Sequence, residues 1–261
     1  MSDMFSIKGK TALVTGGSRG IGYMIAETYL RAGAEVYLSA RKESACKQAE
    51  QELSQFGEVH SFAADVSDPE QCGRLIDRVG QEAGKLDVLI NNAGASWGAT
   101  FDDFPESAWD KVLGLNVKAP FVLTQRARVL LESASTTDDP ARVINIGSID
   151  GLMVPGFNNF SYSASKAAVH HLTRHMAAEL APKILVNAIA PGPFPTKMTD
   201  KMLESVGDDL VEASPVGRLG RAEDIGAAAV YLASRATSYM TGAVIPLDGG
   251  LSTTIGLGIT L

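Results

Sequence analysis

Short apolar runs alternate with longer amphipathic segments along most of the chain. The apolar runs have the length of strands buried in a parallel sheet, and they occupy residues 10–15, 34–40, 59–63, 86–91, 142–147, 184–189 and 244–247. Apolar positions at helical spacing predict helices over residues 21–32, 42–56, 105–131, 160–180 and 222–233. Because strands and helices alternate without a break, the sequence predicts an α/β fold built on one doubly wound parallel sheet.

Composition agrees with one globular domain over residues 1–261, since 45% of the residues are hydrophobic and 20% are charged. The net charge of −7 argues against a nucleic-acid-binding protein, which usually presents a basic face. We expect no membrane span, and the N-terminus lacks the basic and apolar pattern of a signal peptide. Cys46 and Cys72 lie in polar segments without metal-ligand neighbours, so we expect reduced thiols and a cytoplasmic protein.

A glycine-rich turn joins the first predicted strand to the first predicted helix. Its residues are Gly16, Gly17, Ser18, Arg19, Gly20, Ile21 and Gly22. Glycines let the backbone approach a pyrophosphate, and the helix N-terminus supplies amide donors and a partial positive charge. The turn therefore predicts a dinucleotide site, with a tight turn that binds no ligand as the alternative.

The end of the second strand indicates which dinucleotide binds. NAD-specific sites carry an acidic residue there, which holds the 2′-hydroxyl of the ribose. This chain has Ala40, followed by Arg41, and it has Arg19 in the glycine turn. Because no carboxylate repels a 2′-phosphate and either arginine can bind one, the sequence predicts NADPH/NADP+. The alternative is that both arginines are solvated surface charges.

Two further strand ends carry candidate cofactor contacts. Asp65 and Val66 follow the third strand, where a carboxylate can accept a hydrogen bond from an adenine amino group. Asp65 can instead cap the next helix, a role for which Asp68 competes. The fourth strand ends in Asn91, Asn92, Ala93 and Gly94. The two amides can tie strands together or line the cofactor site, and the small residues permit close backbone approach.

Candidate catalytic residues cluster between residues 116 and 166. Tyr162 and Lys166 are four residues apart, so on a helix they leave one face a turn apart. A cation there lowers the pKa of the phenol, which then exchanges a proton with a carbonyl or alcohol oxygen. Ser148 follows a strand and can hydrogen-bond the same oxygen. Asn116 is an amide inside a helical pattern and must find partners. Structural roles are the alternative for each residue.

The sixth strand leads into a proline-rich loop that contains Pro191, Gly192 and Thr196. Closely spaced prolines make this loop rigid and extended, and it borders the expected ligand crevice. We expect a substrate flap over about residues 193–213, because the second part of that segment mixes methionines with many charges.

The histidines do not predict a metal centre. His171 and His175 are four residues apart, but no third ligand is evident, so we expect no metal. His170 lies one turn beyond Lys166, and we expect it to pack rather than to take part in catalysis.

Together the motifs resemble the short-chain dehydrogenase/reductase family over nearly the whole chain. The matching segments are Thr15-Gly16-x-x-x-Gly20-x-Gly22, Asn91-Asn92-Ala93-Gly94, Asn116, Ser148, Tyr162-x-x-x-Lys166 and Pro191-Gly192. The resemblance implies one Rossmann-type domain with a seven-stranded parallel sheet, a nicotinamide cofactor and a homotetramer with dihedral symmetry.

The resemblance also implies roles for individual residues. Asn116 would hold a water that relays protons to Lys166, and Lys166 would also bind the nicotinamide ribose. Ser148 would orient the carbonyl group, and Tyr162 would be the general acid. Thr196 would contact the nicotinamide carboxamide.

Within the family, the chain looks most like reductases of 3-oxoacyl thioesters, especially the rhamnolipid-associated type. The segments Gly94-Ala-Ser-Trp-Gly98 and Val143-Ile-Asn-Ile-Gly-Ser148 carry this likeness. We therefore expect an NADPH-dependent reductase whose substrate is a small-molecule ketone or an acyl thioester. The alternatives are an NAD-linked alcohol or sugar dehydrogenase and a non-catalytic dinucleotide-sensing protein.

Overall fold

A computed structural model describes residues 2–254 of the chain. It contains one sheet of seven parallel strands in the order β3-β2-β1-β4-β5-β6-β7. The strands are β1 (Thr11–Thr15), β2 (Glu35–Ala40), β3 (Val59–Ala63), β4 (Val88–Asn91), β5 (Ala141–Ile146), β6 (Ile184–Pro191) and β7 (Val244–Leu247). Each predicted strand is present, with ends that differ by no more than two residues. The predicted doubly wound parallel sheet is therefore confirmed.

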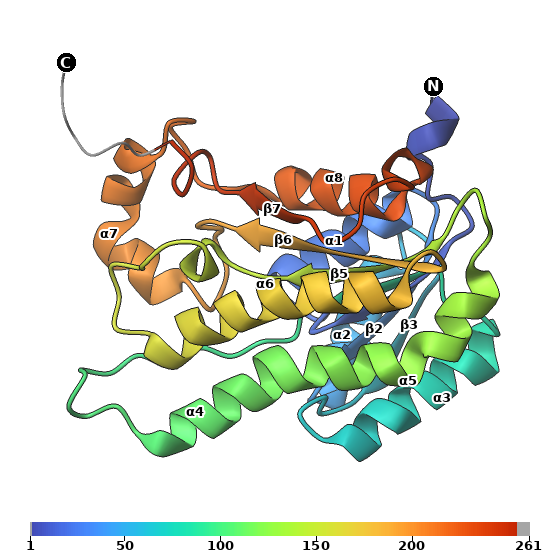
Figure 1. Ribbon diagram of the computed structural model, residues 1–261, viewed down its shortest axis with the longest axis horizontal. Coiled ribbons are helices and arrows are strands. Elements are labelled where there is room, and N and C mark those ends of the chain that lie inside the picture. Colours follow the sequence, from blue (N-terminus) through green and yellow to red (C-terminus); the bar gives the residue numbers. More distant parts are fainter. Residues whose placement is uncertain (1, 255–261) are drawn as a thin grey trace.

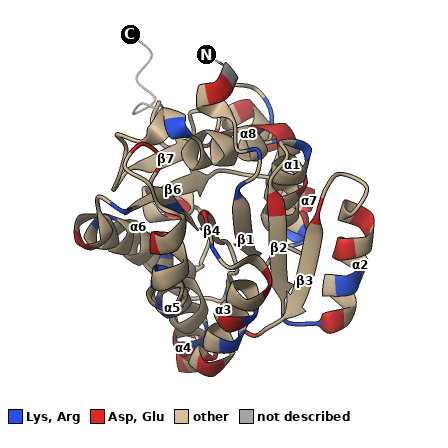
Figure 2. Cartoon of the chain, turned by 90° about the vertical axis from the view of Figure 1, so that its right-hand side faces the viewer, with Lys and Arg blue, Asp and Glu red and all other residues tan. Residues whose placement is uncertain are grey.

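Helices cover both faces of the sheet (Figure 1). One face packs against α1 (Gly20–Arg31), α2 (Glu43–Leu53) and α8 (Ala222–Ala233). The other face packs against α3 (Pro69–Ala83), α5 (Ala119–Ala134) and α6 (Phe160–Leu180). Because the strands have apolar neighbours on both sides, their side chains are almost all buried and uncharged, whereas the outer helices carry most charges (Figure 2).

The prediction of one continuous helix over residues 105–131 is wrong. The structure has α4 (Glu106–Leu113), a π-helical turn (Gly114–Lys118) and then α5. Pro105 is the N-cap of α4 rather than a first-turn residue. A π turn leaves the apolar pattern almost unchanged, so periodicity alone does not reveal it.

The polar segment 132–140 is less exposed than its composition suggests. Helix α5 continues to Ala134, and Pro140 is buried. Asp139 accepts a hydrogen bond from Lys10 Nζ at 2.7 Å, which ties the segment to the start of β1. Composition predicts a turn here, but it cannot reveal an ion pair formed with a residue 129 positions away.

Beyond β6 the chain forms α7 (Asp200–Ala213), a helix in which no residue is buried. Val206 interrupts its helical geometry with φ −137° and ψ 18°. No helix within the described part of the chain is long and apolar enough to cross a membrane. The apolar segment 251–261, which we expect to pack on a neighbouring subunit, lies outside the described residues except for its first four positions.

Candidate active site

The candidate site lies where strands β1, β4, β5 and β6 end. These four strands are consecutive neighbours in the sheet, and β1 and β4 meet at the point where the strand order reverses. In open parallel sheets, ligands bind beyond the carboxyl ends of the strands at this switch point. The topology therefore brings together the glycine turn, the Asn92 segment, Ser148 and the Pro191 loop.

The glycine turn between β1 and α1 has the backbone that a dinucleotide site needs. Gly16 and Gly20 have φ values of 66° and 58°, a region that favours glycine. A Cβ on Gly22 would clash with Asn92 Nδ2 and with the carbonyl oxygen of Gly16. Arg19 is the N-cap of α1, and its side chain makes no capping hydrogen bond. The first amides of α1 are therefore left for an anion.

Asn92 holds the backbone of the glycine turn in place. Its Nδ2 donates to the carbonyl oxygens of Thr15 at 2.8 Å and Gly16 at 3.2 Å. Thr15 Oγ1 in turn accepts from the backbone amides of Asn92 and Ala93, at 3.0 and 3.1 Å. These bonds confirm that an amide here ties β1 to β4. Thr15 is a positioning residue whose role the motif alone does not reveal.

The two arginines expected to select the cofactor lie on adjacent elements. The turn contacts the end of β2, because Gly17 N donates to Ser39 O at 3.1 Å. Arg19 and Arg41 are both exposed, and within residues 2–254 neither side chain forms an ion pair. Ala40 ends β2 and leaves no carboxylate at this position. The donor set therefore fits a 2′-phosphate.

Asp65 and Val66 follow β3 at the same edge of the sheet. Asp68 is the N-cap of α3 and accepts from Glu70 N at 2.8 Å, so Asp65 is not needed as the cap. Asp65 Oδ1 accepts from the amide and hydroxyl of Ser67, at 3.0 and 2.7 Å. Val66 is buried. The structure thus leaves Asp65 at a strand end, and its contact with adenine stays a prediction.

Helix α6 and the end of β5 bring together three of the expected catalytic side chains. Lys166 is buried, and its Nζ donates to Ile146 O at 2.7 Å. The same nitrogen lies 5.4 Å from the centroid of the Tyr162 ring. Ser148 is also buried, and its hydroxyl lies close enough to the phenol to lower the pKa of Tyr162. A carbonyl oxygen placed between Ser148 and Tyr162 would meet two hydroxyl donors.

Asn116 lies in the π turn, and its side chain connects two segments of the site. Its Oδ1 accepts from Ala95 N at 2.9 Å, and its Nδ2 donates to Ala95 O and to Ser165 Oγ, each at 2.9 Å. The side chain therefore links the segment after β4 to helix α6, between Tyr162 and Lys166. π turns are frequent at functional sites, where they redirect a side chain. The water expected at Asn116 stays a prediction.

The pKa of Tyr162 is shifted upward, opposite to the expected direction. Burial is the main cause that raises it to about 12, Asp150 raises it further, and the Ser148 hydroxyl opposes the rise. Burial also lowers the pKa of Lys166 to about 8, and Asp150 opposes that shift. The expectation that Lys166 lowers the pKa of Tyr162 is therefore not met in the protein alone, because desolvation of the phenol is the larger effect.

The Pro191 loop closes the site from the β6 side. Gly192 N donates to Leu247 O at 3.0 Å, which anchors the loop to β7. The Thr196 side chain faces the glycine turn, since a Cβ on Gly20 would lie 3.5 Å from it. The loops after β1 and β6 therefore meet above the sheet edge, where a nicotinamide ring and its carboxamide would lie.

Two polar residues of the site were not predicted from the sequence. Asp150 follows Ser148 by two positions and accepts from Asn159 Nδ2 at 2.8 Å. Asp150 is the only ionisable residue in the segment 147–159. That isolated carboxylate was the available signal for Asp150, whereas nothing in the sequence marks Asn159 as its partner.

Comparisons with known proteins agree with this geometry. A family model described as enoyl-(acyl carrier protein) reductase matches residues 16–252. The chain belongs to the short-chain dehydrogenase/reductase family.

Named relatives cover nearly the whole chain. A rhamnolipids biosynthesis 3-oxoacyl-[acyl-carrier-protein] reductase of Pseudomonas aeruginosa is 45% identical over 255 residues, covering 96% of this chain and 99% of the relative. A 2-dehydro-3-deoxy-D-gluconate 5-dehydrogenase of Bacillus subtilis is 40% identical, with coverage of 96% and 97%. The solved RhlG/NADP active-site complex of Pseudomonas aeruginosa has a TM-score of 0.93 at 44% identity, covering 97% of this chain and all of that chain.

Proposed function

We propose that this protein is an NADPH-dependent reductase of ketones, and that its substrates are 3-oxoacyl thioesters. The observation that supports this most is that the glycine turn expected to bind NADP lies at the same sheet edge as Tyr162 and the buried Ser148 and Lys166. The similar solved structure that contains NADP supports the choice of cofactor. A non-catalytic dinucleotide sensor would not need this group of side chains.

The chain's residues would hold the cofactor in an extended crevice. Bound NADPH supplies the hydride for reduction of the carbonyl carbon. The α1 amides after Arg19 would bind the pyrophosphate, and Arg19 and Arg41 would bind the 2′-phosphate. Asp65 and Val66 would contact adenine, and Asn92, Ala93 and Gly94 would line the adjacent ribose. Pro191, Gly192 and Thr196 would line the nicotinamide. Because both arginines are exposed and unpaired within the described residues, either can turn to the phosphate.

The catalytic roles follow from the positions of four side chains. Ser148 would donate a hydrogen bond to the carbonyl oxygen, and Tyr162 would give that oxygen its proton. Lys166 uses one N–H on Ile146 O, and within residues 2–254 no other acceptor lies within bonding distance of its Nζ. Its other two N–H groups would bind the ribose and a proton-relaying water. Asn116 would hold the end of that relay.

The side chains at the entrance to the site favour an acyl substrate over a sugar acid. The loops after β4 and β5 join there, because Ala99 N donates to Asn158 O at 3.2 Å. Large apolar side chains are exposed on the loops at this edge, namely Trp97, Leu152, Met153, Val154, Phe157 and Met198. An acyl chain gains from covering such a surface. A sugar acid, which is polar throughout, would gain nothing from covering that surface.

The flap and the assembly belong to the same proposal. The segment 193–213 includes α7. Because α7 has no buried side chain, this helix can move to cover a bound substrate. Trp109, Phe121 and Val129 are exposed on α4 and α5, and they would be covered in a homotetramer with dihedral symmetry. We propose a cytoplasmic protein with one domain over residues 1–261. Light scattering at micromolar concentration should give a tetramer, and a monomer would contradict the assembly.

A substrate panel tests the proposed function. Initial rates would be measured with NADPH and with NADH on 3-oxoacyl thioesters of increasing chain length, simple ketones and keto-sugar acids. We expect the highest kcat/KM with NADPH and a medium or long 3-oxoacyl thioester. A preference for NADH together with a sugar acid would favour the sugar dehydrogenase alternative, which the similarity to the Bacillus subtilis relative makes worth testing.

A further inference from the structure

A carboxylate that the proposed mechanism does not use lies beside the catalytic group. Asp150 belongs to the short 3-10 turn η3 (Ile149–Gly151), which follows Ser148 directly. This turn packs on the backbone of α6, since a Cβ on Gly151 would lie 2.5 Å from the carbonyl carbon of Lys166. The turn therefore lies directly against α6, which places Asp150 near both Tyr162 and Lys166.

Two hydrogen bonds fix the direction of the Asp150 side chain. Its backbone amide donates to Ser148 Oγ at 3.2 Å, and its Oδ2 accepts from Asn159 Nδ2 at 2.8 Å. Asn159 is the N-cap residue of α6, the helix that carries Tyr162. The carboxylate therefore bridges the turn that presents Ser148 and the start of the helix that presents the phenol.

Other charges near α6 are either exposed or neutral. The helix packs against α4 and the π turn, whose ionisable groups Glu106, Asp110, Lys111 and Lys118 are all exposed. Strand β6, which also packs on α6, has none. On α6 itself, His170 is buried, and burial is the main cause that lowers its pKa to about 4, so it is neutral near pH 7. His171, Arg174, His175 and Glu179 are exposed.

Asp150 is thus the ionised group that acts on both members of the Tyr-Lys pair. Its charge raises the pKa of Tyr162 and opposes the fall in the pKa of Lys166. Lys166 in return opposes the rise that burial causes in the pKa of Asp150. A negative charge near a phenol disfavours the phenolate, and near an ammonium it favours the protonated form.

We propose that Asp150 is a positioning residue that keeps Tyr162 protonated and thereby extends the pH range of ketone reduction to higher pH. This inference rests on the proposed reductase function, because it concerns the proton that Tyr162 gives to the carbonyl oxygen. Reduction needs the phenol, whereas oxidation needs the phenolate as the base. A carboxylate beside the pair therefore keeps the phenol protonated to higher pH without touching the substrate.

The test compares two variants that separate the charge from the hydrogen bond. Asp150→Asn removes the charge but keeps an oxygen that accepts from Asn159 Nδ2. Asn159→Ala removes that bond but keeps the charge. For each protein, kcat/KM would be measured against pH for reduction with NADPH and for oxidation of the product alcohol with NADP+.

We expect Asp150→Asn to move the alkaline limit of reduction to lower pH by about one unit. The acid limb of oxidation should move down by the same amount, because a lower pKa forms the phenolate at lower pH. Asn159→Ala should change the rates at all pH values without moving either limb. Below the pKa of the Asp150 carboxyl, wild type and Asp150→Asn should converge, since both are then neutral.

A second readout does not depend on activity. Isotope-labelled tyrosine followed by NMR, with Tyr162→Phe to assign the signal, reports the titration of the phenol in the protein without substrate. We expect the Tyr162 signal to titrate at lower pH in Asp150→Asn than in wild type. An unchanged titration together with unmoved kinetic limbs would overturn the role of Asp150. A wild-type protein that reduces no carbonyl compound with NADPH would instead overturn the proposed function, and the NMR titration would still decide on Asp150.

Discussion

Strand β5 carries a buried cation site at each end, and the two sites are built differently. At its carboxyl end, Lys166 donates to Ile146 O, and the described residues offer its Nζ no second acceptor. At its amino end, the fully buried Arg142 donates to Asp139, Ser234 O and Ser238 Oγ, and also to Pro140 O. Only Nε of Arg142 lacks a partner within residues 2–254.

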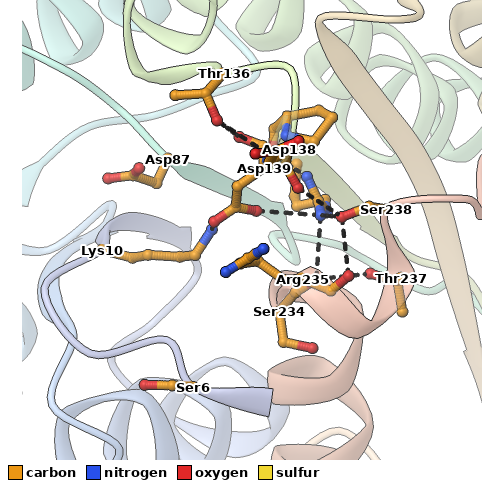
Figure 3. A network of polar contacts seen from close by, with 12 residues as sticks. Ser6, Lys10, Asp87, Thr136, Asp138, Asp139, Ser234, Arg235, Thr237 and Ser238 are labelled. Carbon is orange, nitrogen blue, oxygen red and sulfur yellow. Dashed lines mark hydrogen bonds and ion pairs between the residues drawn. The ribbon is translucent and has the colours of Figure 1, made fainter. Parts of the chain in front are cut away.

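Arg142 is a buried charge that stabilises the fold, whereas Lys166 is a buried charge that keeps donors available for a ligand. Around Arg142 the partners come from the chain, and Lys10 adds an ion pair to Asp139 at 2.7 Å. The network joins the starts of β1 and β5 to the end of α8, far in sequence but adjacent in space (Figure 3). Around Lys166, at the sheet edge where a cofactor would bind, the described residues leave two N–H donors without an acceptor. A buried cation whose hydrogen bonds are incomplete is therefore the better guide to function.

The largest expected effect is at the carboxyl end of β5, where a substitution should lower turnover and leave cofactor binding unchanged. Tyr162→Phe removes only the hydroxyl, so the proton donor is lost while the ring still packs. We expect kcat to fall by about 10²–10⁴-fold, the usual contribution of a positioned acid. The affinity for NADPH, measured by fluorescence titration, should stay near that of wild type. A variant that retains most of its turnover would remove Tyr162 from its assigned role.

The next effect is at the amino end and concerns stability alone. Arg142→Met removes the buried donor of Pro140 O and the guanidinium bonds to Ser234 O, Ser238 Oγ and Asp139, so the free energy of unfolding should fall by about 3 kcal/mol. Arg128→Met is the matched control, because its exposed i,i+4 pair with Glu132 contributes less than about 1 kcal/mol. Urea unfolding checks both values, and equal losses in the two variants would contradict the structural role of Arg142.

A smaller effect is expected at the cofactor's 2′-phosphate. Losing one charged hydrogen bond costs roughly 1.5–3 kcal/mol, so Arg41→Ala should weaken NADPH binding by about ten- to a hundredfold. The double variant Ala40→Asp with Arg41→Ala adds a carboxylate for the 2′-hydroxyl and should prefer NADH. The check is kcat/KM for both cofactors on both proteins. Wild type that uses the two cofactors equally would leave Arg19 and Arg41 as surface charges.

The smallest effect, counted per unit of pH, is a pH dependence of stability caused by His170. Its pKa is about 4 in the folded protein, below its usual value of 6.5, so the unfolded chain binds the proton more readily. Unfolding free energy should therefore fall as pH drops from 6.5 to 4, by up to about 1.4 kcal/mol per unit. His170→Gln should flatten this slope, whereas His175→Gln, at an exposed position, should not. Thermal unfolding across this range measures both slopes.

The sequence predicted which segments come together at the candidate site wherever a local pattern carries the information. Strand periodicity placed the ends of β1, β4 and β5, and these ends determine where the glycine turn, Asn92 and Ser148 meet. The four-residue spacing of Tyr162 and Lys166 was sufficient because α6 is one uninterrupted helix. What depends on distant partners was not predicted. The Arg142 network needs segments about a hundred residues apart, and the pKa of Tyr162 depends on burial that no spacing reveals.

The most direct test is the rate of NADPH oxidation with a 3-oxoacyl thioester, measured on two variants that each remove one buried cation. Lys166→Met should lose nearly all activity and unfold at a urea concentration no lower than wild type, because a buried charge with few partners adds little stability. Arg142→Met should keep its kcat/KM while folded and unfold at a lower urea concentration. An active Lys166→Met protein, or a stable Arg142→Met protein that has lost its activity, would contradict the division between the two ends of β5.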